Sequence, residues 1–105
     1  MDAVLAIRRA ALEAQAELNR LYAGGTPPAG SALDQAGLRD GMAIVEDFLD
    51  RGEAGVALEH LLYMVNEPSL HLSPQSRADV DQAASSLGLF HLIRDQGNAD
   101  LRSHG

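Results

Sequence analysis

The chain has 105 residues, 46% of them hydrophobic, which predicts one domain around a single hydrophobic core. Its 15 Asp and Glu outnumber 8 arginines, and the formal charge of −7 disfavours nucleic acids and anionic membranes as partners. The absence of cysteine excludes disulfides, thiolate metal sites and thiol nucleophiles. Two interpretations of the acidity remain open: a basic protein partner, or solubility alone.

We do not expect the first residues to form a targeting signal. Asp2 comes at once, and Arg8 and Arg9 follow inside an amphipathic pattern, where a signal peptide would have an uninterrupted apolar segment. No stretch of eighteen apolar residues occurs anywhere in the chain. We therefore expect a soluble, cytoplasmic protein.

A helix is predicted over residues 2–23, because apolar residues recur there every three or four positions. Its apolar stripe consists of Val4, Ile7, Ala11, Ala14, Leu18 and Leu21, widened by Leu5, Leu12 and Tyr22. The opposite face carries Arg8, Arg9, Glu13, Glu17 and Arg20, at spacings that allow pairs within the helix. Gly24 and Gly25 end the helix.

The proline-containing segment 24–31 is predicted to be a loop, and Ser31 could cap a short turn after it. A second helix is expected over residues 38–51, ended by Gly52, and a third over residues 53–66, ended by Pro68. A fourth helix should begin with Ser73 as N-cap and Pro74 at its first position, and should end at Gly88. Residues 89–95 could add a short fifth helix, and we expect residues 97–105 to form a flexible tail.

No stretch alternates apolar and polar residues as a half-buried strand does. The predicted fold is therefore all-α: a compact antiparallel bundle of four helices plus a short C-terminal fifth helix, in one domain spanning residues 1–105. Neighbouring helices should be antiparallel because the connections are short.

The chain offers no recognisable catalytic, cofactor or metal site. The four histidines lack a paired-ligand spacing, so a surface or loop position is the simpler interpretation for His60 and His71. The carboxylates lie opposite the apolar stripes, where solvent keeps them ionised, whereas acid–base catalysis needs one with a raised pKa. No serine stands in a nucleophile-elbow context. We therefore expect a protein that is not an enzyme and holds no cofactor.

Acidic residues concentrate where the second and third helices meet at Gly52. The candidate partner-binding residues are Glu46, Asp47, Asp50, Glu53, Glu59, Tyr63 and Glu67. If the two helices are antiparallel neighbours, their acidic strips can merge into one surface, and like charges placed so closely cost some stability. Tyr63 adds an aromatic residue of the kind that often anchors an interface. The alternative interpretation is an ordinary solvated face, with Tyr63 overhanging the edge of the core.

A resemblance to a known family arises at the same residues. The pattern is Val45-x-Asp47-Phe48-x-Asp50-x-Gly52-Glu53-x-Gly55-x-Ala57-Leu58-Glu59-x-Leu61, then Glu67 and finally Leu87-Gly88-Leu89. Over residues 38–90 it resembles the small MafI-type immunity proteins of bacterial polymorphic toxin systems, which mediate contact-dependent inhibition. The resemblance implies a non-enzymatic protein that binds and silences a cognate toxin domain. Such toxins are often nucleases with positively charged clefts, which an acidic helical surface would occupy or cover.

Three hypotheses follow. The first is a cytoplasmic immunity protein that neutralises a basic, nuclease-type toxin through the acidic surface. The second is a non-enzymatic dimerisation or regulatory adaptor module, a homodimer formed through the stripe between Val4 and Leu21 of the first helix. The third, a small metal-dependent enzyme, rests only on scattered histidines and acids.

Overall fold

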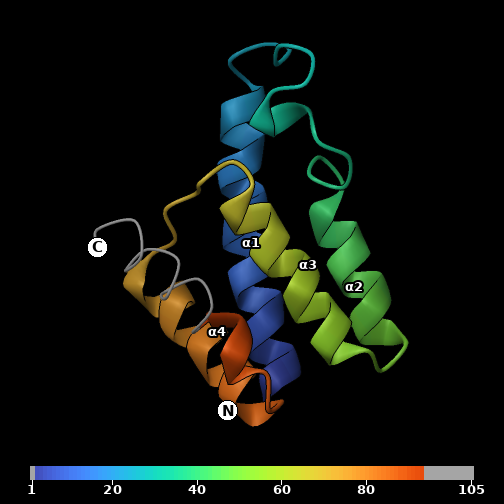
Figure 1. The fold of residues 1–105 in the computed structure, drawn as a ribbon, viewed down its shortest axis with the longest axis vertical. Helices are drawn as coiled ribbons and strands as arrows, with labels where there is room; N and C mark the ends of the chain where they lie inside the picture. Colours follow the sequence, from blue (N-terminus) through green and yellow to red (C-terminus); the bar gives the residue numbers. More distant parts are fainter. Residues whose placement is uncertain (1, 94–105) are drawn as a thin grey trace.

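The computed structural model describes residues 2–93, and these form an all-helical fold (Figure 1). The elements are α1 (Ala3–Tyr22), the 3-10 turn η1 (Ala32–Asp34), α2 (Gly41–Asp50), α3 (Ala54–Asn66) and α4 (Pro74–Ser86). A further helical turn covers residues 90–93. The predicted bundle of four helices with a short fifth is confirmed, and no strand occurs among residues 2–93. The tail expected at residues 97–105 lies outside the described part of the chain.

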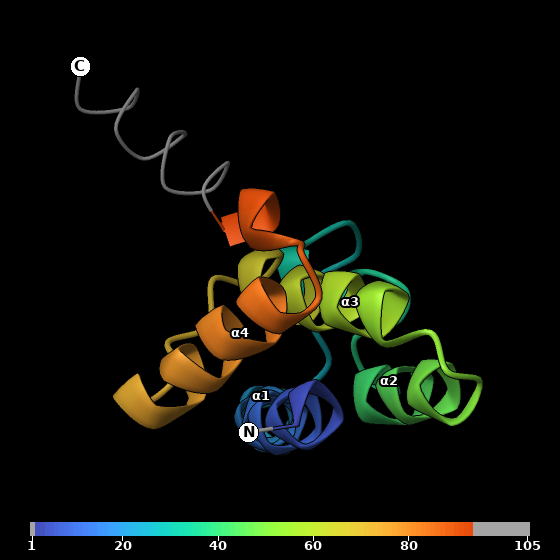
Figure 2. The ribbon, with the colours of Figure 1, turned by 90° about the horizontal axis from the view of Figure 1, so that it is seen from below.

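The helices are arranged in two layers, which Figure 2 shows from one end. α1 and α2 lie side by side in one layer, and α3 and α4 lie over them in the other. α1 contacts all three other helices and packs most extensively on α4, while α2 packs mainly on α3. α3 and α4 contact each other only sparsely. One core cluster lies between the layers.

The side of α1 that faces the core is made mostly of alanine. Its buried residues are Ala6, Ile7, Ala10, Ala11, Ala14 and Leu18. α4 contributes the fully buried Ala83 and Ala84. Short side chains on facing helices allow their axes to approach closely, toward the lower end of the usual range of about 8–10 Å.

The prediction that Leu5 and Leu12 widen the buried stripe is wrong. Their side chains are 45% and 57% exposed, while Ala6 and Ala10 are fully buried instead. α1 is enclosed by helices on three sides, and the two leucines lie on the fourth. The periodic pattern places the largest apolar residues in the core. Here the enclosed side of α1 is instead the side with small residues, because these let the neighbouring helices come close.

Two consecutive arginines of α1 join it to different helices. The Nε of Arg8 donates a 2.6 Å hydrogen bond to Glu46 of α2, and Arg9 pairs with the buried Asp79 of α4 at 3.1 Å. From the sequence alone, this face of α1 is expected to face solvent and to form pairs within the helix. The observed pairs of Arg8 and Arg9 differ from that prediction because α2 and α4 flank α1, so the charged residues of α1 lie at the edges of helix–helix contacts.

Glu13 of α1 caps the start of α4. Its carboxylate accepts hydrogen bonds from the backbone N–H of Ser73 at 2.6 Å and from the hydroxyls of Ser73 and Ser76 at 2.7 and 3.0 Å. Ser73 is the predicted N-cap, and its Oγ accepts from the N–H of Ser76. The bond from the Ser73 N–H lowers the pKa of Glu13, because it favours the ionised carboxylate.

The segment that contains η1 and leads into α2 is fastened by three ring side chains. The hydroxyl of Tyr22 donates to the carbonyl of Leu33 at 2.7 Å, and that of Tyr63 donates to the carbonyl of Ala36 at 2.8 Å. His60 Nε2 lies 3.0 Å from the carbonyl of Gly37. The predicted loop at 24–31 is confirmed, but Ser31 makes no capping hydrogen bond.

α2 begins at Gly41, three residues later than predicted. Leu38 is fully buried in the turn before it, so the chain enters the core before the helix starts. A Cβ atom at Gly41 would lie 2.6 Å from both Sδ and Cε of the fully buried Met64 of α3. The glycine therefore sets how closely α2 and α3 approach each other.

We expect Gly41→Ala to lower the free energy of unfolding by about 1–3 kcal/mol, because the added methyl group must displace Met64. Met64→Ala alone should cost about 2–5 kcal/mol by leaving a cavity. In the double variant, the cavity left by Met64→Ala accommodates the methyl group of Gly41→Ala. Its loss of unfolding free energy should therefore be smaller than the sum of the losses in the two single variants. Urea unfolding of all four proteins tests this, and strict additivity would contradict the contact.

We expect Glu13→Gln to destabilise the protein at neutral pH by about 1–3 kcal/mol, because charge-assisted hydrogen bonds to the start of α4 are lost. The folded-state pKa of Glu13 lies below its ordinary value of 4.5. Its contribution is therefore complete above that value and is lost as the pH falls further. The variant and the wild type should converge in stability at low pH. Glu17→Gln is the control, because the ion pair of Glu17 among residues 2–93 is with Arg20 on the surface.

Candidate protein-binding surface

The seven candidate residues divide into three groups in the structure. Glu46 lies on the side of α2 that faces α1. Asp47, Asp50 and Glu53 surround the turn between α2 and α3. Glu59, Tyr63 and Glu67 follow one another along α3 and just past its end at steps of four residues.

Glu46 is an internal tie and not part of a free surface. Both of its carboxylate oxygens accept from Arg8, at 2.6 Å from Nε and 3.3 Å from Nη2. The hydrogen bond with Glu46 raises the pKa of Arg8, so the arginine stays cationic. Because both partners are half-buried between α1 and α2, Glu46 holds those helices together.

The turn between α2 and α3 displays two carboxylates. Asp47 pairs with Arg51 one helical turn away, at 2.7 Å, so its charge is largely compensated. Asp50 and Glu53 are exposed, and neither belongs to an ion pair among residues 2–93. Gly52, with φ of +75°, reverses the chain and lets the N–H of Glu53 reach the carbonyl of Phe48 at 2.8 Å.

The strip along α3 combines exposed acids with partly exposed apolar groups. Glu59 and Glu67 are exposed and are also outside every ion pair of the described residues. Tyr63 is half-buried, and its hydroxyl is already bonded to Ala36, so only part of its ring faces solvent. Val56, three residues before Glu59, is 42% exposed. The strip therefore offers apolar contact area bordered by carboxylates.

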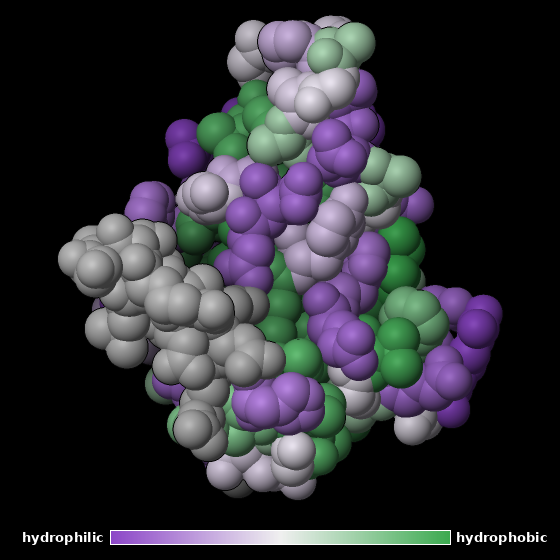
Figure 3. Space-filling model, viewed as in Figure 1, coloured by the Kyte–Doolittle hydropathy of each residue, from purple (hydrophilic) through white to green (hydrophobic). Residues whose placement is uncertain are grey.

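The space-filling view shows where hydrophilic residues gather on one face of the molecule. In Figure 3, hydrophilic residues run along α3 in the middle of the molecule, and a second hydrophilic group covers the α2–α3 turn at the lower right. Hydrophobic residues lie between them. We give the name α2–α3 acidic surface to the exposed acids of the α2–α3 turn and of α3 together with Tyr63: Asp47, Asp50, Glu53, Glu59, Tyr63 and Glu67.

The net charge is distributed unevenly along the chain. Residues 2–23 contain three arginines and three acids, so they are formally neutral. Residues 24–93 contain three arginines and ten acids, and they therefore carry the whole formal charge of −7. The negative potential consequently arises from the part of the chain that builds the α2–α3 acidic surface.

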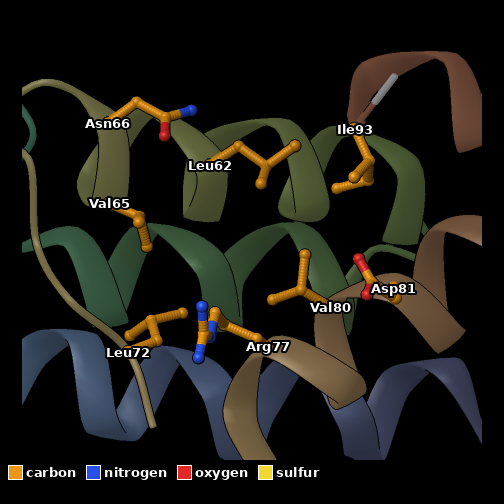
Figure 4. A pocket seen from close by; sticks show the side chains of 8 residues that line it. All are labelled: Leu62, Val65, Asn66, Leu72, Arg77, Val80, Asp81 and Ile93. Carbon is orange, nitrogen blue, oxygen red and sulfur yellow. The ribbon is translucent and has the colours of Figure 1, made fainter. Parts of the chain in front are cut away.

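A hollow between α3 and α4 was not predicted from the sequence. Its volume is about 260 Å³, and Figure 4 shows Leu62 and Val65 of α3, Val80 of α4 and Ile93 around one space. Leu72 and Asn66 also line it, and Arg77 and Asp81 add charged groups. The periodicity of a helix shows which of its sides is apolar, but it cannot show that α3 and α4 stay too far apart to fill the space between them.

Among residues 2–93, no group of three or more His, Asp or Glu side chains is placed to hold a metal ion. No helix in the same range is both long enough and apolar enough to cross a membrane. Comparisons with protein-family models, curated proteins and solved structures gave no match. A function must therefore be argued from the surface chemistry of the chain itself.

We expect Tyr63→Phe to lower the free energy of unfolding by about 0.5–1.5 kcal/mol, because the carbonyl of Ala36 loses its hydrogen bond. The amides of residues 35–38 should exchange faster with solvent in the variant, while those of α4 should be unaffected. Chemical denaturation and amide hydrogen exchange measure the two effects. Unchanged exchange in the segment would show that the hydroxyl does not fasten it.

Proposed function

We propose that this chain is a cytoplasmic, non-enzymatic immunity protein that binds and neutralises a cognate bacterial toxin domain through the α2–α3 acidic surface. One observation carries the proposal. Asp50, Glu53, Glu59 and Glu67 remain exposed and outside every ion pair of the described residues, although Arg8, Arg9, Arg20 and Arg51 each pair with another acid.

A basic protein domain fits this surface better than a small ligand does. The carboxylates are spread over the α2–α3 turn and the length of α3, which suits a broad contact and not a closed pocket. The exposed side of Val56 and the ring of Tyr63 supply apolar area, and acids border it as charged rims border many interfaces. Complementary charge would also speed the encounter between the two proteins.

A nuclease-type toxin is the partner class that this chemistry favours. Nucleases attract the phosphate backbone with positively charged clefts, and a carboxylate surface competes for the same cationic side chains. Binding over the cleft would exclude the nucleic acid substrate. No catalytic group of the present chain is required, because inhibition follows from occupancy alone.

The glycines of the run that carries the family resemblance have structural roles. Gly52 reverses the chain with a positive φ, and a Cβ at Gly55 would lie 3.2 Å from Cδ1 of Leu89. Both glycines are thus explained by the turn and by packing. The proposal therefore rests on the distribution of charge and not on the glycine pattern.

We expect Asp50→Arg and Glu59→Arg each to weaken toxin binding by at least roughly tenfold and to make it less sensitive to salt. If a secreted protein with a basic C-terminal domain is encoded directly upstream, that domain is the probe, and binding is measured by calorimetry and by growth rescue on co-expression. Asp81→Arg is the matched control, because it changes the net charge equally from an exposed site on α4.

Two results would count against the proposal. If Asp81→Arg weakens binding as much as the other two substitutions do, the effect comes from net charge and not from this surface. If co-expression of the wild-type chain gives no protection against the neighbouring domain, the immunity function itself is wrong.

A further inference from the structure

The outer side of α1 carries an uncharged line of residues that no part of the described chain covers. The members follow one another at steps of seven, four, three and four residues, which places them along one side of a helix. They are Leu5, Leu12, Ala16 and Asn19 of α1 and Ala23, its C-cap residue, all exposed, and we call them the α1 outer stripe. The two leucines are among the most exposed large hydrophobic side chains of the described residues.

The stripe faces away from the rest of the fold. α1 has α2 beside it and the α3–α4 layer above it, so its open side points out of the opposite surface (Figure 2). The apolar residues that the sequence suggested for dimerisation, including Ile7, Ala11 and Leu18, are fully buried within the chain. Any partner of α1 must therefore use the outer stripe.

The arginines of α1 are all paired within the chain. Arg8 pairs with Glu46, Arg9 with Asp79, and Arg20 with Glu17. The stripe itself has no ionisable side chain. It is therefore an uncharged line on a segment, residues 2–23, that is formally neutral with three arginines and three acids, in a molecule whose net charge is −7.

We propose that the α1 outer stripe binds a second copy of this chain, with the two α1 helices antiparallel. A basic or a nucleic acid partner would gain nothing from a neutral line, whereas two copies of an acidic chain repel one another least where each is neutral. The inference does not depend on the proposed toxin binding, which uses other residues.

The order of side chain sizes supports an antiparallel pairing. A two-fold axis at the level of residue 14 places Leu12 of one copy opposite Ala16 of the other, and Leu5 opposite Ala23. Each large side chain then meets a small one, as close packing between helices requires. A parallel pair in register would instead place leucine on leucine and alanine on alanine, which leaves gaps beside the alanines.

Sedimentation equilibrium over a wide concentration range tests the association. The mass should rise reversibly from 11.1 kDa toward twice that value, and salt should strengthen the dimer by screening the repulsion between two acidic chains. Salt should weaken binding to a basic toxin, so the two interactions respond in opposite directions. A wild-type chain that stays monomeric at about millimolar concentration would overturn the proposal. A dimer with a Kd of about 1 mM has a binding free energy of only about 4 kcal/mol, so even a weak association would be detected at that concentration.

Leu12→Glu should abolish the association without affecting folding, because the side chain is 57% exposed. Val56→Glu is the matched control, since it places the same charge at an exposed apolar site on α3 and should leave the dimer intact. Circular dichroism checks that both variants are folded. Equal loss of association in both variants would overturn the assignment to α1.

The absence of cysteine allows the orientation to be tested directly. A mixture of Leu5→Cys and Ala23→Cys chains should form a mixed disulfide dimer under mild oxidation. Leu5→Cys chains alone should cross-link poorly. In the antiparallel pair, residue 5 of one copy lies level with residue 23 of the other, so the two residues 5 are separated by 18 residues of helix, or about 27 Å at 1.5 Å per residue. Efficient cross-linking of Leu5→Cys with itself would contradict the antiparallel arrangement.

Discussion

The close packing of α1 against three other helices is the constraint on which the rest of the structure depends. Alanines on its enclosed side allow α4 and α3 to approach, and small side chains continue into α4 at Ala83 and Ala84. Because alanine buries little apolar area, polar ties at the edges add specificity. Arg8 and Arg9 fix α2 and α4, and the carboxylate of Glu13 fixes the start of α4.

These ion pairs and hydrogen bonds also affect which part of the molecular surface is negatively charged. Three of the arginines belong to α1 and balance the three acids of residues 2–23, so that segment is formally neutral. The acids of the α2–α3 turn and of α3 have few cations near them, and only Asp47 is paired, with Arg51. The fold therefore presents two faces of different chemistry, one acidic and one apolar and neutral, and two such faces suit two different partners.

The sequence predicted the elements well, because strong local signals mark them. Ser73 and Pro74 begin α4, Gly52 ends α2, and the 3.6-residue periodicity identifies the first helix. Side chain partners across helices could not be predicted, since they depend on which helix lies beside which. That is why Glu46 was placed on the free surface and Leu5 and Leu12 in the core, and why the hydrogen bond of Tyr63 to Ala36 was missed. The exposure of Asp50 and Glu59 can be predicted from the sequence, because it depends only on which side of its own helix each residue occupies.

Backbone amide NMR tests most directly whether a basic protein domain binds on the α2–α3 acidic surface. On titration with a basic toxin domain that the chain protects against, we expect shifts and broadening to concentrate in residues 47–67, while the amides of α1 stay in place. Perturbations centred on α1 or α4, with residues 47–67 unaffected, would contradict it.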